Sequence, residues 1–373
     1  MTRIAYLLTQ DRGGPVDLTV RLAAALLAQN ADVRVFGPVP ARGAESLGAH
    51  HEPITVADKE NLAAAARARR AVREWEPDIV HAQDRRAGLV LAGLRRARRR
   101  PILLQTYHGV PDDVTEPWFR GARGAAGPSA YTRAVLACDA AVARMLDRTI
   151  VPAEAMGQFL RRRLRVPAGR LARIGNCVEP AEPSPPAGPV RQLIFVGLLV
   201  PRKGILDLLA ALAVPGVLPA GARLTVVGDG PQRAEAERAA QAPPLRGRVA
   251  FLGFRPDVPT LLANADALVL PSTMEQQPLV VAEAMAAGKP VVATDTGGVA
   301  DLLGPDGCRY LVPPGNVSAL AERLRALFAD PAPGRIGAAL AARAQERHTP
   351  DACARRHLEL YAGLAARSGV ISV

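Results

Sequence analysis

The chain has 373 residues, a length that predicts two domains at roughly 150 residues each. With 49% hydrophobic and 22% charged residues, the composition is that of a globular protein and excludes a low-complexity chain. The 47 Lys and Arg residues exceed the 35 Asp and Glu residues by 12, which raises nucleic acid or an anionic membrane as partners. Most of this excess lies in residues 1–185, which carry 28 basic and 19 acidic side chains.

The first half of the chain alternates short apolar runs with Ala- and Leu-rich segments of helical period, a pattern typical of βαβ units and parallel sheets. We expect strands at Ile4–Thr9, Val33–Phe36, Ile79–His81 and Ile102–Thr106, and helices at Val16–Gln29, Glu60–Trp75 and Ala87–Arg98.

The segment Glu179–Pro189 contains five prolines and indicates a linker. After it the alternation resumes, and we expect strands at Leu193–Val196, Leu224–Val227, Val249–Leu252, Ala267–Leu270 and Pro290–Ala293, and a last helix at Ala352–Ala366. The fold class predicted is α/β, with two doubly wound parallel sheets that face each other across a cleft. In such sheets ligands bind beyond the carboxyl ends of the strands.

Four cysteines, Cys138, Cys177, Cys308 and Cys353, are scattered without short spacings, so neither a zinc site nor a redox pair is indicated. We expect reduced thiols in the core. The apolar stretch at residues 4–8 is too short for a signal peptide, and the run at residues 205–213 is too short to span a membrane. A cytoplasmic protein is expected, either freely diffusing or peripheral on the inner face of the membrane.

The segment from Leu268 to Gly298 holds the richest chemistry. A strand ends at Ser272, a polar loop follows, and Pro278 opens a helix as its first residue, where a missing N–H costs nothing. The N–H groups at this helix start and the helix dipole favour an anion. Glu275 and Glu283 flank the start, and would hold sugar hydroxyls around a phosphate; the plainer reading is two unrelated surface acids.

The stretch from Glu275 through Glu283, Gly288 and Pro290 to Gly297-Gly298 resembles the retaining glycosyltransferases of family 4, which have the GT-B fold. Their signature is two glutamates separated by seven residues. Further matches follow in order along almost the whole chain: Gly13-Gly14, Pro77–His81, His108-Gly109, Ile174–Glu179, Phe195–Gly204, Val226–Pro231 and Phe251–Phe254.

This resemblance implies two Rossmann-like domains, at residues 1–182 for the acceptor and 190–350 for the nucleotide-sugar, joined by residues 183–189. Residues 351–373 are implied to pack back on the first domain. Glu275, His108 and Lys203 are the implied catalytic residues. The implied substrate-binding residues are Gly13, Gly14, His81, Arg202, Lys203, Gly228, Phe251, Gly253, Phe254, Gln277, Pro278, Leu279, Val280 and Glu283.

In this scheme Lys203 and Arg202 bind the diphosphate of the donor. Glu283 binds the ribose and Glu275 binds the donor sugar, whereas Phe251–Phe254 contact the base. The family usually has Arg after Gly197, where this chain has Leu198. No Asp-x-Asp pair occurs, so a metal or other cofactor is not expected, and Lys203 with the helix dipole would carry the charge. The implied mechanism is retaining transfer in which the leaving phosphate assists deprotonation of the acceptor hydroxyl.

The expected partners are a nucleotide-diphosphate sugar and a glycan or lipid-linked acceptor. Three Arg-rich stretches, at residues 67–70, 95–100 and 161–165, either rest on anionic lipid or are solvated helix faces. Nucleic acid is disfavoured, because no aromatic residues interleave the charge. The leading hypothesis is a transferase of cell-surface polysaccharide or glycolipid synthesis. A nucleotide-sugar epimerase of the same fold and a non-catalytic membrane protein with a vestigial nucleotide site are the alternatives.

Overall fold

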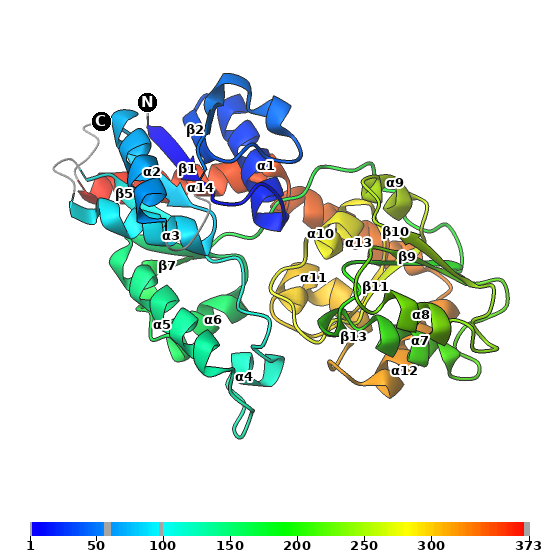
Figure 1. Ribbon diagram of the computed structural model, residues 1–373. Helices are drawn as coiled ribbons and strands as arrows, with labels where there is room; N and C mark the ends of the chain where they lie inside the picture. The colour runs from blue at the N-terminus through cyan, green and yellow to red at the C-terminus, as the bar shows by residue number, and fades with distance from the viewer. Residues whose placement is uncertain (1, 56–60, 97–99, 369–373) are drawn as a thin grey trace. The chain divides into compact units, whose positions relative to one another are not determined.

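The computed structural model describes residues 2–55, 61–96 and 100–368, which divide into two compact units (Figure 1). Unit 1 comprises residues 1–177 and 349–373, and unit 2 comprises residues 178–348. The expected domain limit at residue 182 thus lies five residues beyond the change of unit. Val178 belongs to unit 2 because its amide donates to the carbonyl of His348 at 2.8 Å and its side chain packs in a unit 2 core cluster.

Unit 1 is built on a parallel sheet of seven strands in the order β3-β2-β1-β4-β5-β6-β7, counted over the described residues. Its elements are β1 (Arg3–Leu7), α1 (Gly14–Ala28), β2 (Asp32–Gly37), β3 (His51–Pro53), α2 (Leu62–Glu74), β4 (Ile79–Ala82), α3 (Arg85–Ala92), β5 (Ile102–Thr106), α4 (Glu116–Arg120), α5 (Ala130–Met145), β6 (Arg148–Val151), α6 (Glu154–Arg162), β7 (Leu171–Arg173) and the last helix, α14 (Pro350–Ser368).

Unit 2 contains a parallel sheet of six described strands in the order β10-β9-β8-β11-β12-β13. Its elements are β8 (Gln192–Val196), α7 (Ile205–Ala213), β9 (Arg223–Val227), α8 (Arg233–Ala239), β10 (Val249–Gly253), α9 (Val258–Ala263), β11 (Ala267–Leu270), α10 (Leu279–Ala286), β12 (Val291–Thr294), α11 (Val299–Gly307), β13 (Leu311–Val312), α12 (Val317–Ala329) and α13 (Pro333–Arg347). Two doubly wound parallel sheets are thereby confirmed.

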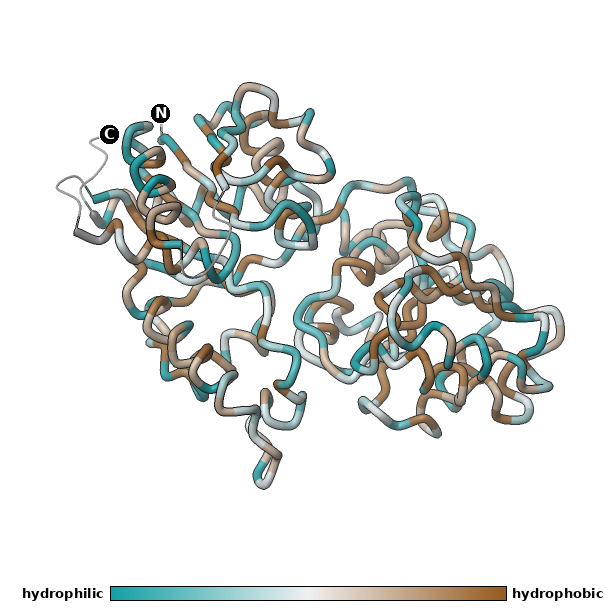
Figure 2. The backbone as a smooth tube through the Cα atoms, viewed as in Figure 1, coloured by the Kyte–Doolittle hydropathy of each residue, from teal (hydrophilic) through white to brown (hydrophobic). Residues whose placement is uncertain are grey.

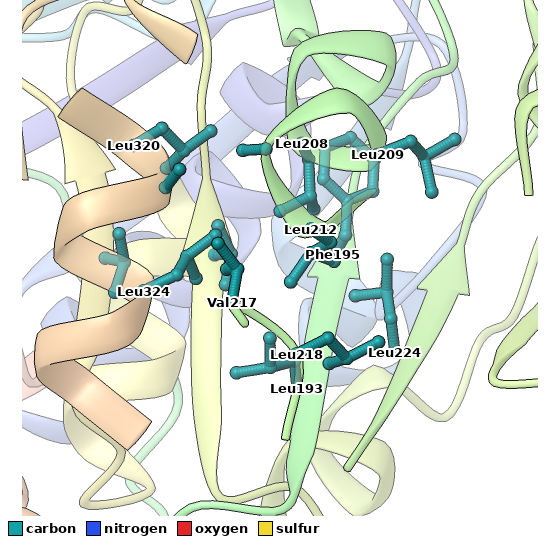
Figure 3. Close-up of a cluster of buried hydrophobic side chains, with 14 of the residues drawn as sticks. Leu193, Phe195, Leu208, Leu209, Leu212, Val217, Leu218, Leu224, Leu320 and Leu324 are labelled. Carbon is teal, nitrogen blue, oxygen red and sulfur yellow. The ribbon is translucent and has the colours of Figure 1, made fainter. Parts of the chain in front are cut away.

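Both sheets are covered on their two faces, as the apolar strands require. In unit 1, Tyr6 and Ile4 of β1 pack with α1 and α14, whereas Ala5 and Leu7 pack with α2 and α3 on the other face. In unit 2, Leu193 and Phe195 of β8 lie against leucines of α7 and α12 (Figure 3). Figure 2 shows the apolar residues gathered along the strands and the hydrophilic ones on the outer turns. Each unit therefore has its own core.

The expected strands and helices all lie on observed elements, with ends that differ by one to several residues. Residues 60, 97 and 98 of the expected helices lie outside the described residues. Four strands were not expected: β3, β6, β7 and β13 are only two to four residues long. Within their bounds these strands hold at most two consecutive apolar residues, so they lack the apolar run that marks the expected strands.

The Pro-rich segment lies on unit 2 rather than apart from it. The amide of Ser184 donates to the carbonyl of Ala287 at 3.0 Å, and the buried ammonium of Lys289 donates to the carbonyls of Ser184 and Ala263. Burial lowers the pKa of Lys289. Residues 183–185 are consequently fixed to the end of α10, although their composition predicts only a linker.

Candidate active site

The carboxyl ends of the unit 2 strands meet at one edge of the sheet, where glycines let the connecting segments touch backbone to backbone. A Cβ at Gly228 would lie 1.9 Å from the carbonyl oxygen of Gly197, and a Cβ at Gly204 would lie 2.2 Å from that of Pro271. Both glycines have positive φ angles, of 128° and 71°. Only glycine adopts these positive φ angles without strain and lacks the Cβ atom that would clash. The backbones of the connecting segments can therefore lie in direct contact at this edge.

Lys203 and Glu275 form the charged centre of this edge. The Lys203 ammonium is ion-paired with Oε1 of Glu275, and the Ser272 hydroxyl donates to the same oxygen at 2.7 Å. The side chains of Lys203 and Glu275 are only 14% and 7% exposed. Within the described residues, both donors to this carboxylate use Oε1. The carboxylate is therefore held in one orientation, with Oε2 left for another donor.

The loop that carries Glu275 is supported by the turn after β12. The Thr294 hydroxyl donates to the carbonyl of Ser272, and the amide of Gly298 donates to that of Gln276 at 2.6 Å. Thr296, in the same turn, has no exposed surface, and its hydroxyl makes no hydrogen bond to described protein atoms. The loop after β11 and the turn after β12 together fix the position of Glu275.

Helix α10 begins beside this loop. Pro278 has a ψ angle of 123°, so it is the N-cap and not the first helical residue as expected. An extended ψ prevents it from joining the helix, whose first residue is Leu279. Glu283 lies partly buried in the second turn of α10, and Gln277 is buried before it. The amides at residues 279 and 280 remain the helix N-terminus that the sequence predicts as an anion site.

The residues expected around the base and diphosphate lie at the same edge. The amide of Gly228 donates to the carbonyl of Gly253 at 2.8 Å, which joins the ends of β9 and β10. Phe254 is 71% exposed, whereas Phe251 packs against the sheet core and offers mainly its backbone. Leu198 is 59% exposed in the connection after β8 that also contains Arg202.

In unit 1, Gly13 is the N-cap of α1 with a φ angle of 106°, and Gly14 is the first residue of that helix.

His108 follows β5, and its Nε2 donates to Oε1 of Gln83 at 3.0 Å. Burial, with the nearby His357, lowers the pKa of His108 to about 4. The ring is therefore neutral at pH 7, and its Nδ1 is an acceptor.

His81 is placed differently from the expectation that it lines an acceptor pocket. It has no exposed surface, and its ring nitrogens are hydrogen-bonded to the hydroxyls of Tyr361 at 2.7 Å and Thr106 at 2.8 Å. The expectation of substrate contact is corrected, because β4 is a central strand and its residue 81 points into the core under α14.

Three supporting residues are not marked by any motif in the sequence. Gln83 positions His108, Ser272 positions Glu275, and Arg85 donates to the carbonyl of Gly109 at 2.7 Å while it pairs with Asp139 at 3.0 Å. The available signal was their place, since each lies within three residues after the end of a strand of a parallel sheet.

The cysteines also differ from the expectation of four core thiols. All four are thiols, but Cys138 is exposed on α5 and Cys308 is only partly buried. Over the residues that the structure describes, no group of three His, Cys, Asp or Glu side chains is arranged to hold a metal ion. None of the described helices combines the length and apolar character needed to cross a bilayer.

Comparison with known proteins agrees with this geometry. A model described as Glycosyltransferase Family 4 matches residues 12–182, and one described as Glycosyl transferases group 1 matches residues 190–330. The 2-deoxystreptamine glucosyltransferase of Streptomyces kanamyceticus is 39% identical over 39% of this chain and 38% of its own length. The GDP-mannose-dependent alpha-mannosyltransferase of Mycobacterium tuberculosis is 32% identical over 66% of this chain and 63% of its own. The chain thus spans less than two thirds of these relatives.

Two solved structures match nearly the whole chain. Sucrose-phosphate synthase from Thermosynechococcus elongatus has a TM-score of 0.78 at 26% identity, over 98% of this chain and 100% of that one. Anabaena Alr3699/HepE, solved in complex with UDP, has a TM-score of 0.78 at 22% identity, over 97% and 100%. With both glycosyltransferase models in tandem on two parallel-sheet units, this chain belongs to the GT-B glycosyltransferase superfamily.

Proposed function

We propose that this protein is a retaining family 4 glycosyltransferase that moves a sugar from a nucleotide-diphosphate sugar to a glycan or lipid-linked acceptor in cell-surface polysaccharide or glycolipid synthesis. The observation that carries the proposal is the buried group of Lys203, Glu275 and Ser272 beside the start of α10. It combines a cation, an oriented carboxylate and a helix N-terminus.

The donor diphosphate binds beside Lys203 and the amides at the start of α10. Lys203 exchanges the carboxylate of Glu275 for a phosphate oxygen, and its charge stabilises the negative leaving group as the glycosidic bond breaks. Arg202 assists from the same turn. These contacts supply the positive charge of the site from the protein, in keeping with a metal-independent reaction.

The sugar and nucleoside are held by the remaining residues. Glu275, which Ser272 holds by Oε1, presents Oε2 to a sugar hydroxyl. Glu283 binds the ribose, and the segment Phe251–Phe254 borders the base. A neutral His108 contacts the sugar through Nδ1, because its Nε2 is committed to Gln83. The leaving phosphate accepts the proton of the acceptor hydroxyl, so the protein supplies no nucleophile.

The donor is best sought first among UDP-sugars. HepE has been solved with UDP, with UDP and glucose, and with UDP-glucose, and the curated relatives include a glucosyltransferase and a GDP-mannose-dependent enzyme. UDP-glucose and GDP-mannose are therefore the two leading probes, with ADP- and CMP-sugars for comparison.

A thermal-shift panel of these sugars tests the proposal, since a ligand bound by the folded state raises the melting temperature. One nucleotide-sugar is expected to raise it for the intact protein, and Lys203→Ala and Glu283→Ala should abolish the shift. The exposed residues of α8 provide matched controls in Arg238→Ala and Glu235→Ala, which should retain it. If no nucleotide-sugar stabilises the intact protein, the proposal fails. Release of a sugar inverted at C2, without acceptor, would identify an epimerase instead.

Peripheral membrane binding is a separate part of the proposal. Arg161, Arg162 and Arg165 are exposed at the end of α6 and after it, whereas Arg70 and Arg100 are engaged with Glu74 and Asp147. Flotation with phosphatidylglycerol vesicles and with neutral phosphatidylcholine vesicles should show binding to the first only. Equal binding to both would exclude an electrostatic membrane contact.

A further inference from the structure

The ion pair of Lys203 and Glu275 engages the same ammonium that the proposed function gives to the donor diphosphate. Among the described residues, Glu275 is the sole acceptor for this ammonium, and both side chains are largely buried. Because the pair is withdrawn from water, a carboxylate of the chain itself already neutralises the charge of Lys203. A diphosphate must therefore compete with Glu275 for the ammonium.

The two turns that carry this pair are joined through their backbones. The amide of Thr273 donates to the carbonyl of Arg202 at 2.8 Å. Gly204, the residue after Lys203, lies so close to Pro271 that a Cβ at position 204 would be 2.2 Å from its carbonyl oxygen. The two turns are thus held together whether or not the ion pair is formed, and an exchange of partners needs movement of the side chains only.

This exchange affects a nucleoside diphosphate and a nucleotide-sugar differently. When a phosphate oxygen takes the ammonium of Lys203, the carboxylate of Glu275 keeps the Ser272 hydroxyl as its donor and lies near a second negative group. Burial makes such a like-charge contact costly, since little water screens it. The hydroxyls of a donor sugar compensate the carboxylate by donating to it. A nucleoside diphosphate has no sugar at this place and leaves the cost uncompensated.

We propose that Glu275 makes the site discriminate between the intact donor and the nucleoside diphosphate that remains after sugar transfer. It does so by competing with the diphosphate for Lys203, which weakens the binding of any nucleotide that carries no sugar. The inference rests on the proposed function, because it takes the diphosphate to bind at Lys203 and the sugar at Glu275. After transfer, the return of Lys203 to Glu275 favours release of the nucleotide.

Isothermal titration without acceptor tests this discrimination, with UDP and UDP-glucose as one pair of ligands and GDP and GDP-mannose as the other. Glu275→Gln keeps an oxygen for the Ser272 hydroxyl but removes the negative charge that holds Lys203. The Kd of the nucleoside diphosphate should fall roughly tenfold, because a hydrogen bond between charged groups no longer has to be broken. The Kd of the nucleotide-sugar should change little, since the freed ammonium is offset by a weaker acceptor for the sugar.

Two further variants separate this competition from a general charge effect. Glu235→Gln removes the same charge at an exposed position of α8 in unit 2 and should leave both Kd values unchanged. Glu275→Asp keeps the charge but withdraws it from Lys203, so it should show a smaller gain for the nucleoside diphosphate. Urea unfolding followed by far-UV circular dichroism checks that each variant is folded. If Glu275→Gln is not, Glu275→Asp decides by the same criterion.

The outcomes distinguish this inference from the proposed function. Suppose that a nucleotide-sugar binds the intact protein, but that Glu275→Gln gains no affinity for the nucleoside diphosphate or gains equally for both ligands. The inference is then refuted and the proposed function stands, as it is when Glu235→Gln gains as much. A lysine ammonium that uses its three donors to hold carboxylate and phosphate together would give the first of these results. If neither the intact protein nor any variant binds these ligands, the inference and the proposed function fail together.

Discussion

Gly297 lies so close to Glu275 that a Cβ at position 297 would be 1.9 Å from the carbonyl oxygen of Glu275. The same glycine has a φ angle of 48°, in the left-handed region. The turn after β12 and the loop after β11 are therefore in backbone contact at Glu275, the residue that is expected to hold the donor sugar.

Gly297→Ala should therefore damage both stability and binding. The left-handed φ costs about 1–2 kcal/mol for alanine, and displacement of the loop adds about 1–3 kcal/mol. Gly315→Ala is the matched control, because Gly315 has a φ angle of 69° with no atom within 4 Å of its Cβ position. Urea unfolding followed by far-UV circular dichroism should show the larger loss for Gly297→Ala. Equal losses would mean that the contact with Glu275 is unimportant.

Ser272→Ala should weaken donor binding without unfolding the protein. It removes one of the two donors to Oε1 of Glu275, and hydrogen bonds to a charged group are worth about 1.5–3 kcal/mol, or roughly tenfold or more in affinity. Isothermal titration with the nucleotide-sugar identified by thermal shift measures this change. Ser318→Ala, at an exposed serine of α12, should leave the affinity unchanged. Unaltered binding by Ser272→Ala would remove its positioning role.

Leu198→Arg should strengthen the binding of UDP. Leu198 is 59% exposed at the position where the family 4 glycosyltransferases usually have arginine. The new guanidinium would therefore stay hydrated, and its desolvation would cost little free energy. An added contact to diphosphate worth about 1 kcal/mol corresponds to a roughly fivefold lower Kd. The same change at Leu62, which is 77% exposed in unit 1, controls for net charge. An equal gain from Leu62→Arg would point to a general charge effect.

The sequence was most informative where a pattern is long or a motif is specific. The alternation of apolar runs predicts both parallel sheets, and the place of Lys203 and Glu275 after their strands predicts one edge for both. Their direct ion pair and the shared oxygen could not be predicted, because they depend on the path of two loops 72 positions apart.

His81 shows where a motif misleads. A histidine at the end of a strand predicts a ligand contact, but His81 pairs in register with Tyr6 of the neighbouring strand, and both point toward Tyr361 of α14. This face of the unit 1 sheet is buried only because α14, which lies far along the chain, packs against it. The residues just past the strand, Gln83 and Arg85, reach the region of His108 instead.

Tyr361→Phe should destabilise unit 1. The hydroxyl of Tyr361 is hydrogen-bonded to that of Tyr6 at 2.8 Å and to His81 at 2.7 Å, all in fully buried surroundings. Its removal leaves partners unsatisfied, at about 1–3 kcal/mol. Tryptophan fluorescence in urea measures the loss. Tyr6→Phe should cost less, and the double variant should cost less than the two single changes added together. Strict additivity would show that the network is not coupled.

Unit 1 should also lose stability in mild acid because of His357. Burial lowers the pKa of His357 to about 4, against an ordinary value of 6.5. Between these two values the unfolded chain binds a proton that the folded chain does not, so the free energy of unfolding falls as the pH falls from about 6.5 to 4. The full loss is about 3 kcal/mol for this group. His81, whose pKa burial also lowers, adds to the effect.

His357→Phe should remove part of this acid sensitivity. The ring lies 5.8 Å from those of His81 and Tyr361, a setting that accepts a phenyl group. Urea midpoints by tryptophan fluorescence at pH 7.5 and pH 5 should differ less in His357→Phe than in the unaltered protein. His50→Phe, at an exposed histidine of the same unit, should keep the original difference. If His357→Phe shows the same dependence on pH as the unaltered protein, the buried ring is not the acid-sensitive group.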